Sequence, residues 1–249
     1  MATIAAPADR KASERKFYSW MAIGLVVLMF LGFAPSFYLR DIVPSYPRPN
    51  PTIPWWVALH GLAFTLWMAL IIVQTQLISA RKHAIHMKLG VATVLLAVTL
   101  IPLMYLTAVW QVARGTHFPM TNALTWTVLP LMGIIPFAIL IWTGWTKRRD
   151  APWHKRAMLG AAILVVSGPS IGRLPIVPPT LVGVTILLSL GLLLFVPLFV
   201  WDKRTQGRVH PATWLGFSML AVAHGIPLLV FWTGADWASI AAKLPGVGA

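Results

Sequence analysis

The chain contains no cysteine, and its few acidic residues all lie outside the long apolar runs of the sequence. The absence of cysteine excludes disulfide bonds, thiolate catalysis and cysteine-ligated metal or haem. Without acids inside the apolar runs, the sequence also lacks the parts for aspartate-rich prenyl transfer, bundle di-iron sites and ion-coupled transport through a buried carboxylate. All six acids are expected in tails or loops: Asp9, Glu14, Asp41, Asp150, Asp202 and Asp236.

Apolar residues dominate what is present, because they make up 58% of the 249 residues, more than in a soluble domain. Apolar runs of about 20 residues, which is long enough to cross a bilayer, cover residues 17–38, 54–78, 87–110, 122–145, 157–172, 180–201 and 211–233. We therefore predict an all-α fold, a polytopic membrane bundle of seven transmembrane helices in one domain (17–233). A disordered polar tail (1–16) is expected before this domain and a short tail (234–249) after it.

The positive charges are placed asymmetrically along the chain. The net charge is +14, and the basic clusters fall in the N-terminal tail and in alternate loops, at residues 10–16, 81–88, 147–156 and 203–208. By the positive-inside rule, this pattern predicts a cytoplasmic N-terminus and a C-terminus outside, in a bacterial inner membrane. The excess charge is thus interpreted as topology and as contact with anionic lipid headgroups, and nucleic acid is not an expected partner.

Two histidines lie inside predicted spans in similar local sequences. Ala58-Leu59-His60-Gly61 in the second span resembles Val222-Ala223-His224-Gly225 in the seventh. At a rise of about 1.5 Å per residue, both imidazoles are expected roughly 9–14 Å below the outer surface. We therefore expect His60 and His224 to contribute to one shared site.

Histidine ligation is the chemistry that these residues favour. A haem b between two imidazoles needs only opposed histidines and a flat apolar slot. His60 and His224 are the candidate metal ligands, and Arg173 is a candidate partner for a propionate. The adjoining glycines, Gly61 and Gly225, would let the macrocycle approach. Nearby aromatic residues would wall the slot: Trp56, Phe64, Trp67 and Phe231.

A second histidine pair is expected at the inner side of the membrane. His86 and His154 begin the third and fifth predicted spans at similar depth. They are candidate ligands for a second haem, so that electrons would pass from a quinol or small reductant to an outer acceptor. The leading hypothesis is a b-type haem electron-transfer protein.

Other functions remain open, and no residue is assigned as catalytic. In a non-enzymatic accessory subunit of another membrane complex, or in a carrier or binder of an apolar small molecule, no cofactor is needed. His60, His224 and Arg173 would then form a polar network that fixes helix packing or contacts a ligand. A third alternative is a facilitative pathway lined by imidazole and arginine. Residues 74–76 (Gln-Thr-Gln) would bind a quinone headgroup or join neighbouring helices.

Three stretches resemble a group of uncharacterised bacterial integral membrane proteins. They are residues 32–39 (GFAPSFYL), residues 59–62 (LHGL) with 74–77 (QTQL), and residues 153–156 (WHKR) running on to 168–173 (GPSIGR). This resemblance implies a polytopic helical fold and no assigned reaction. The four-histidine arrangement is also similar in outline to the transmembrane ascorbate-type b cytochromes, which place haem ligands on four core helices. This chain differs in placing His86 and His154 at helix ends.

Overall fold

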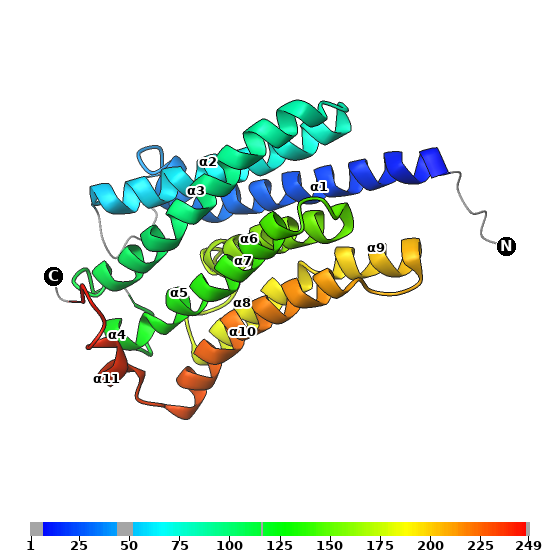
Figure 1. Cartoon of the computed structure of the whole chain (residues 1–249). Coiled ribbons are helices and arrows are strands. Elements are labelled where there is room, and N and C mark those ends of the chain that lie inside the picture. Colours follow the sequence, from blue (N-terminus) through cyan, green and yellow to red (C-terminus); the bar gives the residue numbers. More distant parts are fainter. Residues whose placement is uncertain (1–6, 44–51, 116, 248–249) are drawn as a thin grey trace.

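The long apolar runs fold as helices, because a helix satisfies its own backbone hydrogen bonds and can therefore lie in lipid. The computed structural model describes residues 7–43, 52–115 and 117–247, and no β-strand occurs within these ranges. The first helices are α1 (Pro7–Phe33), which continues into the π-helical turn η1 (Ala34–Tyr38), α2 (Trp55–Ser79) and α3 (His83–Trp110). They run along one axis of an elongated bundle with the later helices (Figure 1).

Two of the predicted spans are interrupted helices. One consists of α4 (Ala123–Trp126), α5 (Val128–Met132) and α6 (Ile134–Thr146), and the other of α8 (Leu181–Leu193) and α9 (Val196–Gln206). Prolines lie close to these interruptions, where they remove a backbone donor. The long helices α7 (Ala151–Ile171) and α10 (Pro211–Thr233) instead continue through an internal proline. The chain ends with α11 (Trp237–Ala241), which packs against α4.

Within the described ranges, six helical segments are long and apolar enough to cross a membrane, and they indicate a membrane protein. They cover Arg10–Tyr38, Trp55–Ser79, His83–Trp110, Ala123–Thr146, Leu181–Gln206 and Pro211–Thr233. The predicted span 157–172 corresponds to α7, which is not in this set. Its hydropathy is lower because it begins with polar residues and is rich in small ones.

Helix α7 forms the centre of the bundle. It packs against α1, α6, α8 and α10, and most of its length is buried by these helices. Small residues allow this close packing, since a Cβ on Gly160 would lie only 3.4 Å from the Cα of Gly216 in α10. The helix can be less apolar than its neighbours because protein, and not lipid, surrounds it.

The basic clusters predicted from sequence gather at one end of the bundle, which we call the basic end. The start of α1 and the α2–α3, α6–α7 and α9–α10 turns all lie there (Figure 1). Helix α11 lies at the opposite end. The α6–α7 turn and the start of α7 together carry the cluster at 147–156.

Two expectations about the charged segments are wrong. Helix α1 begins at Pro7, so residues 7–16 are helical and not a disordered tail, whereas residues 1–6 lie outside the described part. The acids are not confined to tails and loops either, because Glu14 lies in α1 and Asp202 lies in α9. Both helices extend past their apolar runs, because charged residues continue the helix where it leaves the apolar region.

Candidate functional site

His224 in α10 has protein partners at both ring nitrogens: Nδ1 donates a hydrogen bond and Nε2 is the acceptor. Its Nδ1 lies 2.9 Å from the carbonyl oxygen of Leu188 in α8, and its Nε2 lies 3.4 Å from the hydroxyl of Ser167 in α7. Only 6% of its surface is exposed. Because both nitrogens have protein partners, neither presents a free lone pair to a metal. The ring instead joins α10 to α7 and α8.

Two glycines create the space for this imidazole. A Cβ on Gly191 of α8 would lie 2.8 Å from the Cε1 atom of His224, and one on Gly168 of α7 would lie 3.3 Å from its Nε2. The adjacent Gly225, which was expected to admit a macrocycle, has no neighbour within 4 Å of its Cβ position. The ring therefore fills the space on the protein side of α10.

His60 in α2 has a different environment. Its ring packs on Phe64, with the centroids 4.8 Å apart, and the backbone of Leu103 in α3 lies beside it. Its Nδ1 is buried and has no hydrogen-bond partner among the described residues. The charge of Arg173 is close enough to act on the ring. His60 is thus a half-buried residue whose buried Nδ1 has no hydrogen-bond partner among the described residues.

The expected haem slot between His60 and His224 does not fit this arrangement. Helix α2 packs mainly on α1 and α3, whereas α10 packs on α5, α6, α7 and α8. The space beside Gly61 is filled by Phe37, whose ring lies 2.6 Å from the position of a Cβ.

The aromatic residues expected to wall that slot pack elsewhere. Phe64 and Trp67 contact Phe137 of α6, Trp56 contacts Trp110, and Phe231 stacks on Trp126. They form separate clusters and do not enclose a common flat space.

The second expected pair, His86 and His154, does come together at the basic end. Their ring centroids are 6.2 Å apart and the ring planes are nearly perpendicular. The Nδ1 of His154 lies 2.7 Å from the carbonyl oxygen of Gly144, to which it donates a hydrogen bond. This bond fixes the tautomer and leaves its Nε2 as an acceptor.

Gln74 of α2 forms hydrogen bonds with His86 and its neighbours in α3. With its amide oriented to satisfy both atoms, its oxygen accepts from the backbone N–H of Gly90 at 2.9 Å and from Thr93 at 3.1 Å. Its nitrogen then donates to the Nδ1 and carbonyl oxygen of His86. Gln74 therefore joins α2 to α3, which is one of the two roles considered for the Gln-Thr-Gln segment.

A carboxylate that the sequence analysis placed in a loop organises the other side of the basic end. Asp202 of α9 is fully buried and forms an ion pair with Arg156 of α7, which is 3% exposed. Its Oδ2 accepts from the hydroxyl of Thr213 at 2.6 Å and from the backbone N–H of His210 at 3.0 Å. Its Oδ1 accepts from the guanidinium of Arg156 and from Gln206 at 2.9 Å. We call these five residues the Asp202 network, and it joins α7, α9 and α10.

The imidazole of His210 lies at the rim of this network. Burial, together with the nearby charge of Arg156, lowers the pKa of His210. Its Nδ1 accepts a hydrogen bond from the backbone N–H of Ala212 at 3.1 Å and so caps α10.

The first turns of α7 direct their basic side chains to different neighbours. His154 faces α3 and α6, and Arg156 faces α9 and α10. Lys155 forms an ion pair with Glu14 of α1 and lies over the ring of Tyr18. Part of the charge that was interpreted as contact with lipid headgroups therefore pairs inside the protein.

Three of the unpartnered polar atoms come from α2, α7 and η1, near the junction of α1, η1, α2 and α7, towards the end opposite to the basic end. They are the Oγ of Ser36 in η1, the Nδ1 of His60 and the Oγ of Ser170 in α7, all buried and without a hydrogen-bond partner among the described residues. We call these three residues the His60 site. The indole nitrogen of Trp67, two turns further along the same face of α2 as His60, is also buried without a hydrogen-bond partner among the described residues.

Close backbone packing brings the three residues of the His60 site to one junction. A Cβ on Gly32 would lie 2.5 Å from the carbonyl oxygen of Ser170, so α1 touches α7 one turn before Ser36. The next residue in η1, Phe37, packs on Gly61 beside His60.

Tyr38 and Arg173 complete the border of this junction. The hydroxyl of Tyr38 donates to Thr65 of α2 at 2.7 Å, since the Thr65 hydroxyl itself donates to the carbonyl oxygen of Gly61. The guanidinium of Arg173 lies 4.2 Å from the ring centroid of Phe33 and donates to the carbonyl oxygen of Pro169.

Larger clusters of side chains that could bind a metal ion are also absent from the described ranges. Within the described ranges, three or more histidine, aspartate or glutamate side chains nowhere gather in a way that could hold a metal ion.

Comparisons with known proteins give no match: no family model, no curated protein and no solved structure is similar to this chain.

Proposed function

We propose that this chain is a membrane protein that binds an apolar small molecule through a polar head, at the His60 site. The observation that carries the proposal is the set of three buried polar atoms without partners, from Ser36, His60 and Ser170. Leaving such a group unpaired costs about 1–3 kcal/mol. A site that several helices maintain at this cost is suited to a ligand that supplies the missing hydrogen bonds.

The local backbone supports the same proposal. The π-helical turn η1 contributes Ser36, and π-helical insertions are often found at functional sites. Two of the free groups are hydroxyls and the third is an imidazole, with the cation Arg173 beside them. The two hydroxyls and Arg173 favour a ligand head with acceptor oxygens. Because the other ring nitrogen of His60 faces the backbone of Leu103, Nδ1 is the acceptor of the neutral ring and favours a hydroxyl on the same head, as in a quinol or a carboxylic acid.

The proposed topology has seven crossings, with the basic end in the cytoplasm of a bacterial cell. Two features support it: the basic clusters share one end, and the start of α1 lies opposite α11 (Figure 1). Helix α7 would cross the membrane inside a ring of more apolar helices. Reporter fusions at both termini test this topology, since opposite compartments are expected.

The ligand proposal is tested with two probes of equal chain length, decylubiquinol and decanoic acid, on the detergent-purified protein. Quenching of tryptophan fluorescence measures the affinity. His60→Phe keeps the packing on Phe64 and removes the hydrogen bond, so binding is expected to weaken about fivefold, since one such bond contributes about 1 kcal/mol. Ser170→Ala should have a similar effect.

His117→Phe is the matched control, because His117 is exposed and its Nδ1 contacts the backbone of Phe118. Equal weakening by the His60 and His117 variants, or no saturable binding of either probe, would contradict the proposal.

A second candidate function is electron transfer through a haem b at the basic end. The observation that favours it is the pair His86 and His154, with ring centroids 6.2 Å apart. The bond from His154 to Gly144 is also of the kind that orients metal-bound histidines. Against it, the Nδ1 of His86 is occupied by Gln74 in the satisfied amide orientation.

An absorbance spectrum separates the two candidates. A Soret band with sharp α and β bands after dithionite reduction, lost in His154→Ala and retained in His60→Phe, would support the haem at the basic end. A flat visible spectrum from protein produced with sufficient haem leaves the ligand-binding function.

A further inference from the structure

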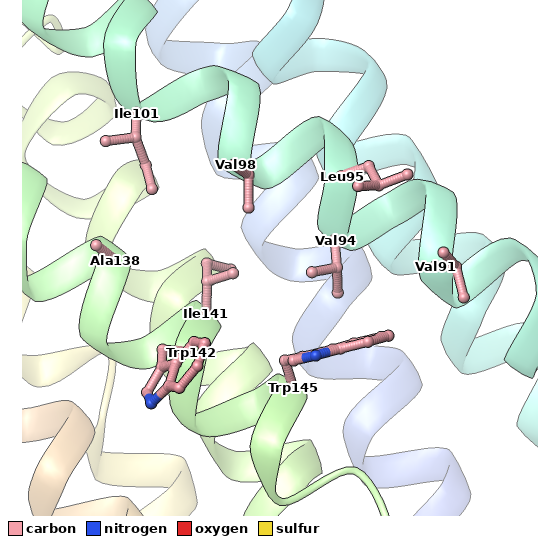
Figure 2. A pocket seen from close by; sticks show the side chains of 9 residues that line it. All are labelled: Val91, Val94, Leu95, Val98, Ile101, Ala138, Ile141, Trp142 and Trp145. Carbon is pink, nitrogen blue, oxygen red and sulfur yellow. The ribbon is translucent and has the colours of Figure 1, made fainter.

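An apolar groove runs along the outside of the bundle between α3 and α6. It has a volume of about 470 Å³ and is lined by aliphatic side chains of α3 and by the end of α6 with two tryptophans: Val91, Val94, Leu95, Val98, Ile101, Ala138, Ile141, Trp142 and Trp145. Figure 2 shows Val94 and Val98 directed towards Ile141 and the tryptophan rings. The groove is separate from the His60 site, which lies among α1, η1, α2 and α7.

The length of the groove matches one leaflet of a membrane. From Val91 to Ile101 the groove follows α3 over ten residues, which corresponds to about 15 Å at 1.5 Å per residue. The hydrocarbon core of a bilayer is about 30 Å thick, so each leaflet contributes about 15 Å. A groove that starts at the basic end and covers this depth fits one acyl chain of the adjoining leaflet.

Positive charge lies at the end of the groove where the headgroup of such a lipid would be. Arg148 is exposed, and its guanidinium lies 4.4 Å from the ring centroid of Trp145 and donates to the carbonyl oxygen of the same residue. Lys88 is exposed one turn before Val91 on the same face of α3. Asp150, the acid of the α6–α7 turn, caps α7 through the backbone N–H of Trp153.

We propose that this groove binds one anionic phospholipid, with an acyl chain between α3 and α6 and the phosphate between Lys88 and Arg148. Trp142 and Trp145 would lie between the acyl chain and the phosphate, as aromatic side chains do at membrane interfaces. Such a lipid closes the side of the bundle where α3 and α6 diverge, and it links the α2–α3 hairpin to α6. This binding goes beyond the proposed function and does not depend on it.

Lipid-dependent thermal stability of the detergent-purified protein tests the inference. Phosphatidylglycerol is expected to raise the Tm by about 5 °C at about 100 times its Kd, and phosphatidylcholine or inorganic phosphate should raise it far less. Arg148→Glu removes the headgroup contact, and Ala138→Trp fills the groove without changing a charge. Both variants should lose most of the shift.

Two control variants separate groove binding from general attraction to the membrane. Arg204→Glu changes an exposed cation of α9 at the same end, and Val200→Trp adds bulk at a 40% exposed position of the same helix. Both should keep the full shift. Loss of the shift in Arg204→Glu, or its retention in Ala138→Trp, would overturn the proposal, because the lipid would then act through charge alone.

Discussion

Two clusters of polar residues in the bundle, the Asp202 network and the His60 site, differ in how far their buried atoms are hydrogen-bonded. At the basic end, Asp202 accepts hydrogen bonds from four different residues, and its charge is balanced by Arg156. Towards the other end, the Oγ of Ser36, the Nδ1 of His60 and the Oγ of Ser170 are buried and have no partner within the described part of the chain. A network in which every polar atom is hydrogen-bonded holds helices together, whereas polar atoms without a partner can still bind a ligand. The comparison therefore separates a structural region from a candidate binding region.

The largest expected effect lies in the Asp202 network. Asp202→Asn leaves the guanidinium of Arg156 buried without a counter-charge, which should cost about 3–5 kcal/mol of unfolding free energy. Thermal or SDS-induced unfolding in detergent measures the loss. Asp150→Asn is the matched control, because that acid only caps α7 at the surface and asparagine caps a helix about as well, so the cost should stay well below about 1 kcal/mol.

A double variant sharpens the same test. Replacing Arg156 by Met together with Asp202 by Leu removes the uncompensated charge and should recover part of the loss, although Thr213 and the His210 N–H lose their acceptor. Equal stability of Asp202→Asn and Asp150→Asn would mean that the basic end is not held by this ion pair.

His224 is expected to behave as a structural residue like Asp202, although its local sequence is like that of His60. His224→Leu removes the hydrogen bonds to Leu188 and Ser167 and should cost about 1–3 kcal/mol. The same unfolding experiment with His117→Leu provides the control. An unchanged unfolding free energy in His224→Leu would place His224 with the unsaturated groups and would reopen a ligand role for it.

The glycines beside His224 offer a third test. Gly191→Ala would place a methyl group 2.8 Å from the imidazole Cε1, so overpacking should cost about 1–3 kcal/mol. Gly225→Ala meets no neighbour and should be neutral or stabilise α10 by up to about 1 kcal/mol through helix propensity. Comparable losses in the two variants would show that the imidazole is not packed against α8.

The positions of the spans could be predicted from the sequence because the length of an apolar run directly reflects the thickness of the membrane. The helices with sufficient hydropathy closely match the predicted ranges, and the pairing of His86 with His154 agrees with their similar depth. Helix α7 also lies where it was expected, but its central position depends on neighbours that hydropathy alone does not identify.

The candidate sites depend on contacts between distant parts of the chain. Asp202 directly follows an apolar run. At such a position the sequence does not distinguish an acid exposed among lipid headgroups from one buried in the protein. Its partner Arg156 lies 46 residues earlier. His60 and His224 lie in similar local sequences, Ala-Leu-His-Gly and Val-Ala-His-Gly, yet the ring of His224 donates to Leu188, 36 residues away in another helix. Local motifs contain no information about such partners. The similar sequences around His60 and His224 therefore suggested one shared haem site, although the two histidines have different surroundings.

The smallest expected effect has the opposite sign and distinguishes the two regions most directly. His60→Phe replaces an imidazole whose buried Nδ1 has no partner by an apolar ring of similar shape, next to Phe64. Removing an unsatisfied polar group should leave stability unchanged or raise it by up to about 1 kcal/mol. Unfolding of His60→Phe and His224→Phe under identical conditions measures this difference. If His60 serves a ligand, His60→Phe should raise the unfolding free energy and weaken probe binding. A loss of stability equal to that of His224→Phe would mean that His60 is saturated in the folded protein, and the contrast between the two regions would fail.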